Sequence, residues 1–174
     1  MTARPAILLA GATGLVGGRA LQRWLAQADG PLLLAPVRRP LAVGHPRLLA
    51  LPGGWDETAI RNALESRGAQ LQAYACCLGT TIRQAGSREA FLEVDRDLVL
   101  ALGGIAHRLG ARQALLVSSV GASAQSGNFY LRVKGEAERG LGALGFERVD
   151  CLRPGLLLGE RGERRPAEAL GQRL

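Results

Sequence analysis

Short apolar runs alternate with longer amphipathic stretches along most of the chain, and this alternation constrains the fold more than any other feature. A short apolar run bounded by turn residues predicts a buried strand, whereas an apolar stripe at helical spacing predicts a helix. The expected strands are residues 6–10, 31–37, 47–51, 71–77, 114–118 and 148–152, and the expected helices are residues 15–27, 57–67, 88–109 and 129–144. Strands that alternate with helices favour a doubly wound parallel sheet with helices on both faces. We therefore predict an α/β fold in which residues 1–174 form one domain.

The composition excludes several other classes of protein. Hydrophobic residues make up 47% of the chain and charged residues 21%, which excludes a disordered or coiled-coil chain. Cys76, Cys77 and Cys151 are too few and too poorly spaced for a disulfide framework or a zinc site, so no metal is expected. Reduced thiols predict a cytoplasmic protein. No uninterrupted apolar run reaches the ~18 residues of a membrane span, so we expect no membrane partner.

The basic residues are almost all arginines. The chain has 22 lysines and arginines in total and a net charge of +7, yet it contains a single lysine, Lys134. Binding of nucleic acid requires positive charges that cluster and that alternate with aromatic residues. Here the arginines are scattered singly or in pairs, and only 4% of residues are aromatic. We therefore expect no nucleic-acid partner.

Directly after the first expected strand comes the glycine-rich sequence Gly11-Ala12-Thr13-Gly14-Leu15-Val16-Gly17. A strand that turns through glycines into a helix lets backbone N–H groups approach a pyrophosphate, and the helix N-terminus adds a partial positive charge. A tight turn without a ligand is the simpler alternative for a glycine motif alone. The position of this glycine-rich sequence between the first strand and the first helix favours a Rossmann-type dinucleotide site.

The end of the second expected strand distinguishes the two nicotinamide cofactors. NAD-preferring sites carry an Asp or Glu there, which accepts a hydrogen bond from the ribose 2′-hydroxyl. This chain has Arg38 and Arg39 instead, and guanidinium groups suit a 2′-phosphate. The sequence thus predicts NADP(H) over NAD(H), unless one or both arginines merely face solvent.

A tyrosine and the lysine of the chain lie four residues apart at the start of the last expected helix. Tyr130 and Lys134 therefore share one helix face. A nearby ammonium lowers the pKa of a phenol and makes it a usable proton donor or acceptor. A lysine kept in a chain that otherwise uses arginine indicates a need for a compact ammonium.

Ser118 and Ser119 follow the fifth expected strand, at the sheet edge where open α/β sheets bind ligands. A serine hydroxyl there can donate a hydrogen bond to a carbonyl oxygen, although a Ser-Ser pair at a strand end can also be a simple turn.

The remaining polar candidates have simpler interpretations. His45 and His107 lack the partner spacing of a metal site or a catalytic triad, and Cys76-Cys77 is expected to pack in the sheet. Asp95 and Asp97 lie on the helix after the fourth strand, where a solvated face is the expected environment, although either could touch the site.

Taken together, these residues resemble the short-chain dehydrogenase/reductase superfamily. The chain looks most like its atypical single-domain branch, which includes the HIV Tat-interacting-protein-like proteins and related bacterial NAD(P)-binding proteins. The stretches that carry the resemblance are residues 11–17, 76–81, 94–97, 118–122, 130–136 and 153–155.

The resemblance implies a serine–tyrosine–lysine site. Tyr130 would be the general acid/base, Lys134 would support it and hold the nicotinamide ribose, and Ser119, or else Ser118, would polarise the carbonyl. The residues that would line the nicotinamide end of the cofactor are Leu78, Gly79 and Thr80, together with Pro154 and Gly155.

Two departures from the family pattern stand out. Asp95 occupies a position where many members of the superfamily have an asparagine, and the chain stops at Leu174, soon after the sixth expected strand, where relatives continue. C-terminal elements could therefore be missing, and a second subunit could cover an exposed sheet edge or apolar face, which predicts a homodimer.

Two functions from different classes fit these residues. The first is an NADP(H)-dependent oxidoreductase that transfers hydride between NADPH and a carbonyl or alcohol substrate, whose identity the sequence does not show. The alternative is a non-catalytic protein that senses NADP(H) and regulates a protein partner.

Overall fold

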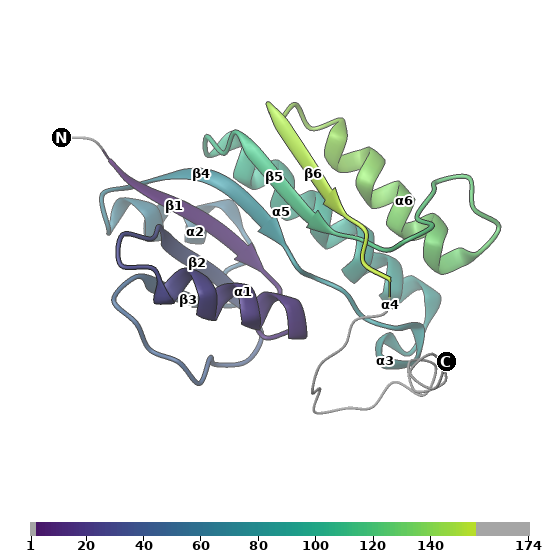
Figure 1. Ribbon diagram of the computed structural model, residues 1–174, viewed down its shortest axis with the longest axis horizontal. Helices are drawn as coiled ribbons and strands as arrows, with labels where there is room; N and C mark the ends of the chain where they lie inside the picture. Colours follow the sequence, from purple (N-terminus) through teal and green to yellow (C-terminus); the bar gives the residue numbers. More distant parts are fainter. Residues whose placement is uncertain (1–2, 156–174) are drawn as a thin grey trace.

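The computed structural model describes residues 3–155 and contains one six-stranded parallel sheet (Figure 1). Its strands are β1 (Arg4–Ala10), β2 (Leu32–Val37), β3 (Leu48–Pro52), β4 (Ala69–Cys76), β5 (Gln113–Val117) and β6 (Arg148–Leu152). They are arranged in the order β3-β2-β1-β4-β5-β6. This is the doubly wound order of the Rossmann fold, in which the winding reverses between β1 and β4. The prediction of a Rossmann-type parallel sheet is confirmed.

Helices connect most of the strands. They are α1 (Leu15–Ala26), α2 (Glu57–Glu65), α3 (Ile82–Ala85), α4 (Arg88–Leu92), the π-helical segment η1 (Glu93–Asp97), α5 (Leu98–Arg108) and α6 (Phe129–Gly142). The expected strands and helices agree with the structure within one or two residues at their ends. Two features were not predicted: the short helix α3, and the π-helical segment that interrupts the expected helix over residues 88–109.

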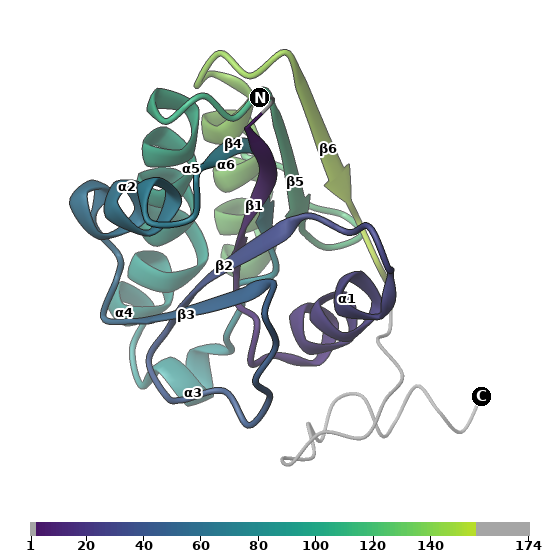
Figure 2. The same ribbon diagram turned by 90° about the vertical axis from the view of Figure 1, so that its left-hand side faces the viewer.

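The sheet carries helices on both faces, as predicted, but unequally. Helix α1 lies on one face, and α2, α5 and α6 lie on the other (Figure 2). The larger core lies between the sheet and these three helices, whereas the smaller one packs Leu21, Trp24 and Leu25 of α1 against β1, β2 and β3. Every residue of β2 is buried, because this strand has neighbours on both edges and cover on both faces.

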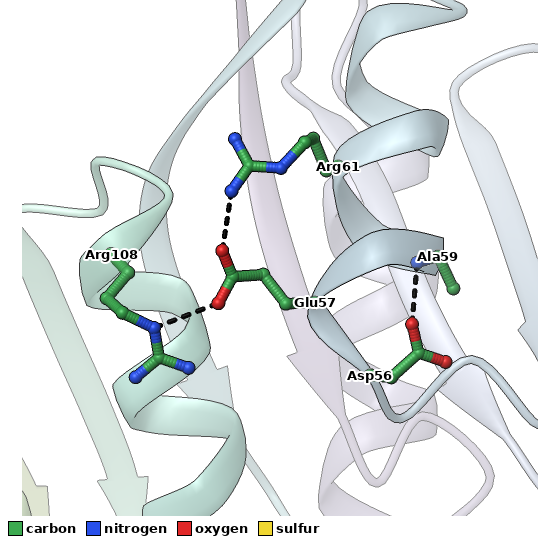
Figure 3. A network of polar contacts seen from close by, with 5 residues as sticks. All are labelled: Asp56, Glu57, Ala59, Arg61 and Arg108. Atoms are coloured by element: carbon green, nitrogen blue, oxygen red, sulfur yellow. Dashed lines mark hydrogen bonds and ion pairs between the residues drawn. The ribbon is translucent and has the colours of Figure 1, made fainter.

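Side chains close the helix ends. The Asp56 carboxylate accepts a hydrogen bond from Ala59 N–H at 2.9 Å and caps α2, and Ser87 Oγ accepts from Ala90 N–H at 3.0 Å and caps α4, as expected for both. Beside the Asp56 cap, the Glu57 carboxylate accepts hydrogen bonds from Arg61 of α2 and from Arg108 of α5 (Figure 3). Polar side chains therefore tie α2 to α5 at the surface.

Within residues 3–155, no helix is long and apolar enough to cross a membrane.

Candidate functional site

Residues from distant parts of the sequence meet at one edge of the sheet. Because all the strands are parallel, the segments that follow β1, β2, β4, β5 and β6 leave the sheet at its carboxyl edge. Ligands of open α/β sheets bind at this edge, where the strand order reverses. The predicted site residues that follow these strands or lie on α6 are Gly11–Val16, Arg38, Arg39, Leu78, Gly79, Thr80, Ser118, Ser119, Tyr130, Lys134, Pro154 and Gly155.

The glycine-rich turn connects β1 to α1 with very close backbone packing. Gly11 has φ +82°, and a Cβ there would lie 2.6 Å from the carbonyl carbon of Cys77. A Cβ at Gly17 would lie 2.1 Å from the carbonyl oxygen of Gly11. Side chains at these two positions would push the turn away from both α1 and the end of β4. The glycines therefore bring the start of α1 against the middle of the sheet.

The N-terminus of α1 suits an anionic group. Gly14 is its N-cap residue and provides no side-chain hydrogen bond, and the first turn contains no acidic residue. The first N–H groups of a helix have no intrahelical acceptor and carry a partial positive charge. The residues present thus fit the pyrophosphate of a dinucleotide, as the sequence predicts.

Arg38 and Arg39 lie directly after β2, next to the glycine-rich turn in the sheet order. Both side chains are exposed, and neither forms a hydrogen bond or ion pair with another residue of the described part of the chain. Their guanidinium groups are therefore able to bind a phosphate at the carboxyl edge.

Lys134 forms a buried ion pair with Asp95. Lys134 Nζ lies 2.8 Å from Asp95 Oδ1, and the side chains are only 4% and 0% exposed. The other carboxylate oxygen of Asp95 accepts a hydrogen bond from Thr80 N–H at 2.9 Å. A Cβ at Gly79 would lie 3.6 Å from Lys134 Nζ. The structure therefore brings together Gly79, Thr80 and Lys134, three of the predicted residues, around one carboxylate.

The expectation that Asp95 faces solvent is wrong. Asp95 lies in η1, where Leu98 N–H donates to the carbonyl of Glu93, five residues earlier, instead of the usual four. This wider turn shifts the register of the side chains. It directs Asp95 toward α6, whereas Asp97 remains exposed and pairs with Arg96 at 2.7 Å. The sequence pattern of a regular α-helix does not show this change of register, so it does not predict the burial of Asp95.

Tyr130 lies in the first turn of α6, whose N-cap residue Asn128 accepts a hydrogen bond from Leu131 N–H at 3.2 Å. Its ring packs against the buried Phe91 of α4, with 5.8 Å between the ring centroids. The Tyr130 hydroxyl makes no hydrogen bond within residues 3–155. The helix thus places a half-buried phenol one turn before the lysine.

The two serines differ in their surroundings. Backbone bonds hold the ends of β5 and β6 together, because Ser118 N–H donates to Leu152 and Val120 N–H donates to Pro154. Ser119 Oγ is partly exposed and donates to the Val120 carbonyl at 3.3 Å. Ser118 Oγ is buried and has no hydrogen bond of good geometry among the described residues. Gly155 is exposed beside Pro154.

Glu138 lies near Ser118 on α6. Burial alone would raise the pKa of its carboxyl, but the Arg153 guanidinium, the nearby Ser118 hydroxyl and the Lys134 charge hold this pKa below its ordinary value of 4.5. A second carboxylate therefore lies close enough to Lys134 to interact with it.

The surroundings of Cys76, Cys77 and the two histidines indicate roles in packing and hydrogen bonding. Burial raises the pKa of the Cys77 thiol to about 12 and also raises that of Cys76, so neither is a reactive thiolate. His45 Nδ1 accepts a hydrogen bond from Arg47 N–H, and the His107 ring packs edge-on against Phe146.

The sheet order and the glycine-rich turn together define the class of Rossmann-type, NAD(P)-binding folds. No family model matches the chain. The chain is 37% identical over 169 residues to "Protein fmp52, mitochondrial" of Emericella nidulans, an alignment that covers 95% of this chain and 72% of the relative. It is also 46% identical over 98 residues to "Protein HTATIP2" of Rattus norvegicus, which covers 56% of this chain and 40% of that protein. The chain belongs to the atypical short-chain dehydrogenase/reductase family that includes these proteins, which confirms the resemblance.

Solved structures agree on the fold. The Bordetella bronchiseptica enzyme WbmG, in complex with NAD, matches with a TM-score of 0.67 and 16% identity over 99% of this chain and 59% of its own. A short chain dehydrogenase from Burkholderia cenocepacia, in complex with NADP, matches with a TM-score of 0.63 and 19% identity over 88% of this chain and 72% of its own. The chain thus spans little more than half the length of WbmG.

The comparisons also correct one prediction. The fungal relatives from Emericella nidulans, Eremothecium gossypii and Aspergillus clavatus are named mitochondrial proteins. They contradict the cytoplasmic localisation that we predicted from the cysteines. The cysteine pattern does not distinguish among reducing compartments.

Proposed function

We propose that this protein is an NADP(H)-dependent oxidoreductase that transfers hydride between NADPH and a carbonyl or alcohol substrate. The observation that carries the proposal is the placement of the single lysine. Lys134 is buried at the carboxyl edge of the sheet, next to Gly79 and one helical turn after Tyr130. A surface charge needs no such burial, and arginine supplies the surface charges elsewhere in this chain.

The residues that would hold the cofactor lie along the carboxyl edge. The N–H groups of the turn at Gly11–Val16 would bind the pyrophosphate, and Arg38 and Arg39 would bind the 2′-phosphate. Lys134 would hold the nicotinamide ribose, and the nicotinamide end would lie against the segments at Leu78–Thr80 and Pro154–Gly155. When bound, the nicotinamide would supply or accept the hydride.

The chain's own residues would handle the proton. In the reductive direction, the Tyr130 hydroxyl would give its proton to the carbonyl oxygen of the substrate, and in the oxidative direction the phenolate would take it back. Lys134 would favour the phenolate through its positive charge. Ser119, or else the buried Ser118, would donate a hydrogen bond to the substrate oxygen as it gains negative charge.

Turnover tests the proposed chemistry. Purified protein is mixed with NADPH and a panel of aldehydes, ketones and quinones, and NADPH oxidation is followed by absorbance. We expect Tyr130→Phe to lower turnover by ~10²–10⁴-fold, the usual value of general acid/base help. Binding of NADPH is expected to remain nearly unchanged, because the hydroxyl does not contact the phosphates. A wild type that binds NADPH but oxidises none of it with any substrate would instead support the NADP(H)-sensing function.

Nucleotide affinity tests the cofactor preference separately. We expect Arg38→Ala and Arg39→Ala to weaken NADPH binding by roughly tenfold or more each, since a charge-assisted hydrogen bond is worth about 1.5–3 kcal/mol, and to leave NADH binding nearly unchanged. Arg4→Ala is the matched control, because it removes the same positive charge at the amino end of β1, away from the carboxyl edge. Equal losses of affinity for the two nucleotides would contradict the assignment of the 2′-phosphate to these arginines.

A further inference from the structure

The buried pair of Asp95 and Lys134 has features that folding alone does not explain. Both side chains are almost completely removed from solvent, and the two residues come from separate helices, η1 and α6. A buried ion pair contributes little net stability, and well-packed apolar residues commonly replace one without loss. The pair lies beside the exposed Gly79, where a Cβ would lie 3.6 Å from Lys134 Nζ.

The surrounding structure fixes the position of the Asp95 carboxylate. Thr80 N–H, in the segment after β4, donates to Oδ2 at 2.9 Å, so that Oδ1 is left for the ammonium. The neighbouring residue Arg96 reaches across to Glu136 of α6 at 3.0 Å and ties η1 to the helix that carries Lys134. The carboxylate is therefore held from two sides, and the ammonium is held by the carboxylate.

A lysine side chain has several rotatable bonds, and an unrestrained ammonium would sample many positions. A site that needs the ammonium in one place requires a partner that is itself fixed. The partner in this chain is the Asp95 carboxylate. Its negative charge also offsets the positive charge that Lys134 presents to Tyr130.

We infer that Asp95 is a positioning residue that holds the Lys134 ammonium in place for the nicotinamide ribose and moderates its charge toward Tyr130. This inference rests on the proposed function. It assigns to Asp95 no contact with the substrate or with the reacting atoms, because it acts through Lys134.

Other titratable and charged groups also face the pair. On β4, the buried Cys76 thiol interacts with both Lys134 and Asp95, and on α6 the Glu138 carboxylate interacts with Lys134. Arg96 and Glu136 neutralise each other beside it. Asp95 is the group in ion-pair contact with the ammonium within residues 3–155, so its charge has the largest effect.

The charge is tested with Asp95→Asn, which keeps the size of the side chain and one acceptor oxygen, for either Thr80 N–H or the Lys134 ammonium, and removes the negative charge. We expect the pH at which alcohol oxidation reaches half its maximum to move lower by ~1 unit, because the unbalanced ammonium favours the phenolate more strongly. The matched control is Asp97→Asn, which removes the same charge from an exposed side chain two residues away. Equal pH profiles for the two variants would overturn the charge-moderating role, since a purely structural role predicts no such shift.

The positioning is tested without turnover. The chain has one lysine, so selective ¹⁵N labelling of lysine gives one side-chain signal. We expect a sharp signal from slowly exchanging ammonium protons in the wild type, its loss in Asp95→Ala, and a roughly tenfold weaker affinity of that variant for NADPH. Asp95→Asn, whose amide oxygen can still accept a hydrogen bond from the ammonium, should retain more of both the signal and the affinity than Asp95→Ala. An unchanged signal and affinity in Asp95→Ala would overturn the inference, whereas an absence of wild-type turnover would overturn only the proposed function.

Discussion

Arg47 shows how one buried side chain completes a helix far from it in sequence. Its guanidinium donates hydrogen bonds to the carbonyl oxygens of Trp24, Leu25 and Gln27 at the end of α1, and the residue is only 8% exposed. The last carbonyl groups of a helix lack intrahelical partners, and a positive charge at the C-terminus also interacts favourably with the helix dipole. The sequence predicts residue 47 as the start of a strand and does not indicate this capping role.

We expect Arg47→Lys to lower the free energy of unfolding by about 1–3 kcal/mol, because an ammonium cannot reach all three carbonyls and leaves some of them unsatisfied. Urea denaturation followed by circular dichroism measures the change. Arg67→Lys is the control, since Arg67 makes a single exposed bond to the Pro46 carbonyl. Equal effects of the two substitutions would contradict the capping role of Arg47.

The glycines of the turn after β1 provide a second residue-scale prediction. We expect Gly17→Ala to abolish binding of both NADPH and NADH and to lower the melting temperature, because its Cβ would overlap the Gly11 carbonyl oxygen at 2.1 Å. The next residue is the control: a Cβ at Gly18 would meet the Ala12 carbonyl oxygen at 3.4 Å, an ordinary contact. Retained nucleotide binding in Gly17→Ala would show that the cofactor lies elsewhere.

Local chemistry decides which residues the sequence can reveal. The glycine-rich turn and the Tyr130–Lys134 spacing are recognisable because their members are close in sequence and share one turn or one helix face. Asp95 meets Lys134 only after two helices pack together, so no spacing rule connects them. The same holds for Arg47, which reaches the end of α1 only when β3 pairs with β2.

At the scale of elements, the apolar runs predicted the strands well because central parallel strands are buried on both faces. The helix over residues 88–109 was predicted in extent but not in its interior, since packing against α6 accompanies the π-helical register of η1. The short helix α3 depends on the Thr81 side chain, which accepts a hydrogen bond from Gln84 N–H, and has too few residues for a periodic signal.

The Glu57 network that ties α2 to α5 predicts a pH dependence of stability. Hydrogen bonds from Arg108 and Arg61 lower the pKa of Glu57 below its ordinary value of 4.5. A carboxyl whose pKa is lowered by folding stabilises the folded state. This contribution is complete when the pH is above the pKa of the carboxyl in the unfolded chain, and it is lost as the pH falls through the pKa in the folded chain. We therefore expect Glu57→Gln to be less stable than the wild type near neutral pH and equally stable at the acid end.

Urea unfolding from neutral to strongly acidic pH measures this difference. Exposed ion pairs contribute little, so the effect should be small and should shrink at high salt. The matched control is Glu65→Gln at the other end of α2. A Glu57→Gln difference that persists unchanged at acid pH would contradict the role of the ion pairs.

At the scale of the whole molecule, one sheet face is only partly covered in the described part of the chain. Helix α1 packs over β1, β2 and β3, and no described helix lies over the same face of β5 and β6 (Figures 1 and 2). Leu152, at the end of β6, is 51% exposed. An apolar side chain on this uncovered part of the sheet is available for contact with a second chain.

We expect a homodimer in which this face is covered, as the sequence analysis proposed. Analytical ultracentrifugation over a range of concentrations measures the association, and Leu152→Ser should shift it toward the monomer. Val43→Ser is the control, because Val43 is 41% exposed on the connection between β2 and β3. A wild type that sediments as a monomer at every concentration would contradict the dimer.

The single buried lysine also determines how the chain responds to chemical reagents. In a chain with one ε-amine, amine-directed acylating agents and cross-linkers have a single side-chain target. The ion pair with Asp95 and the burial of Lys134 protect the ε-amine in the native fold. Its acylation therefore requires the ammonium to leave the ion pair and become exposed, so the rate of that reaction reports on local opening at the carboxyl edge.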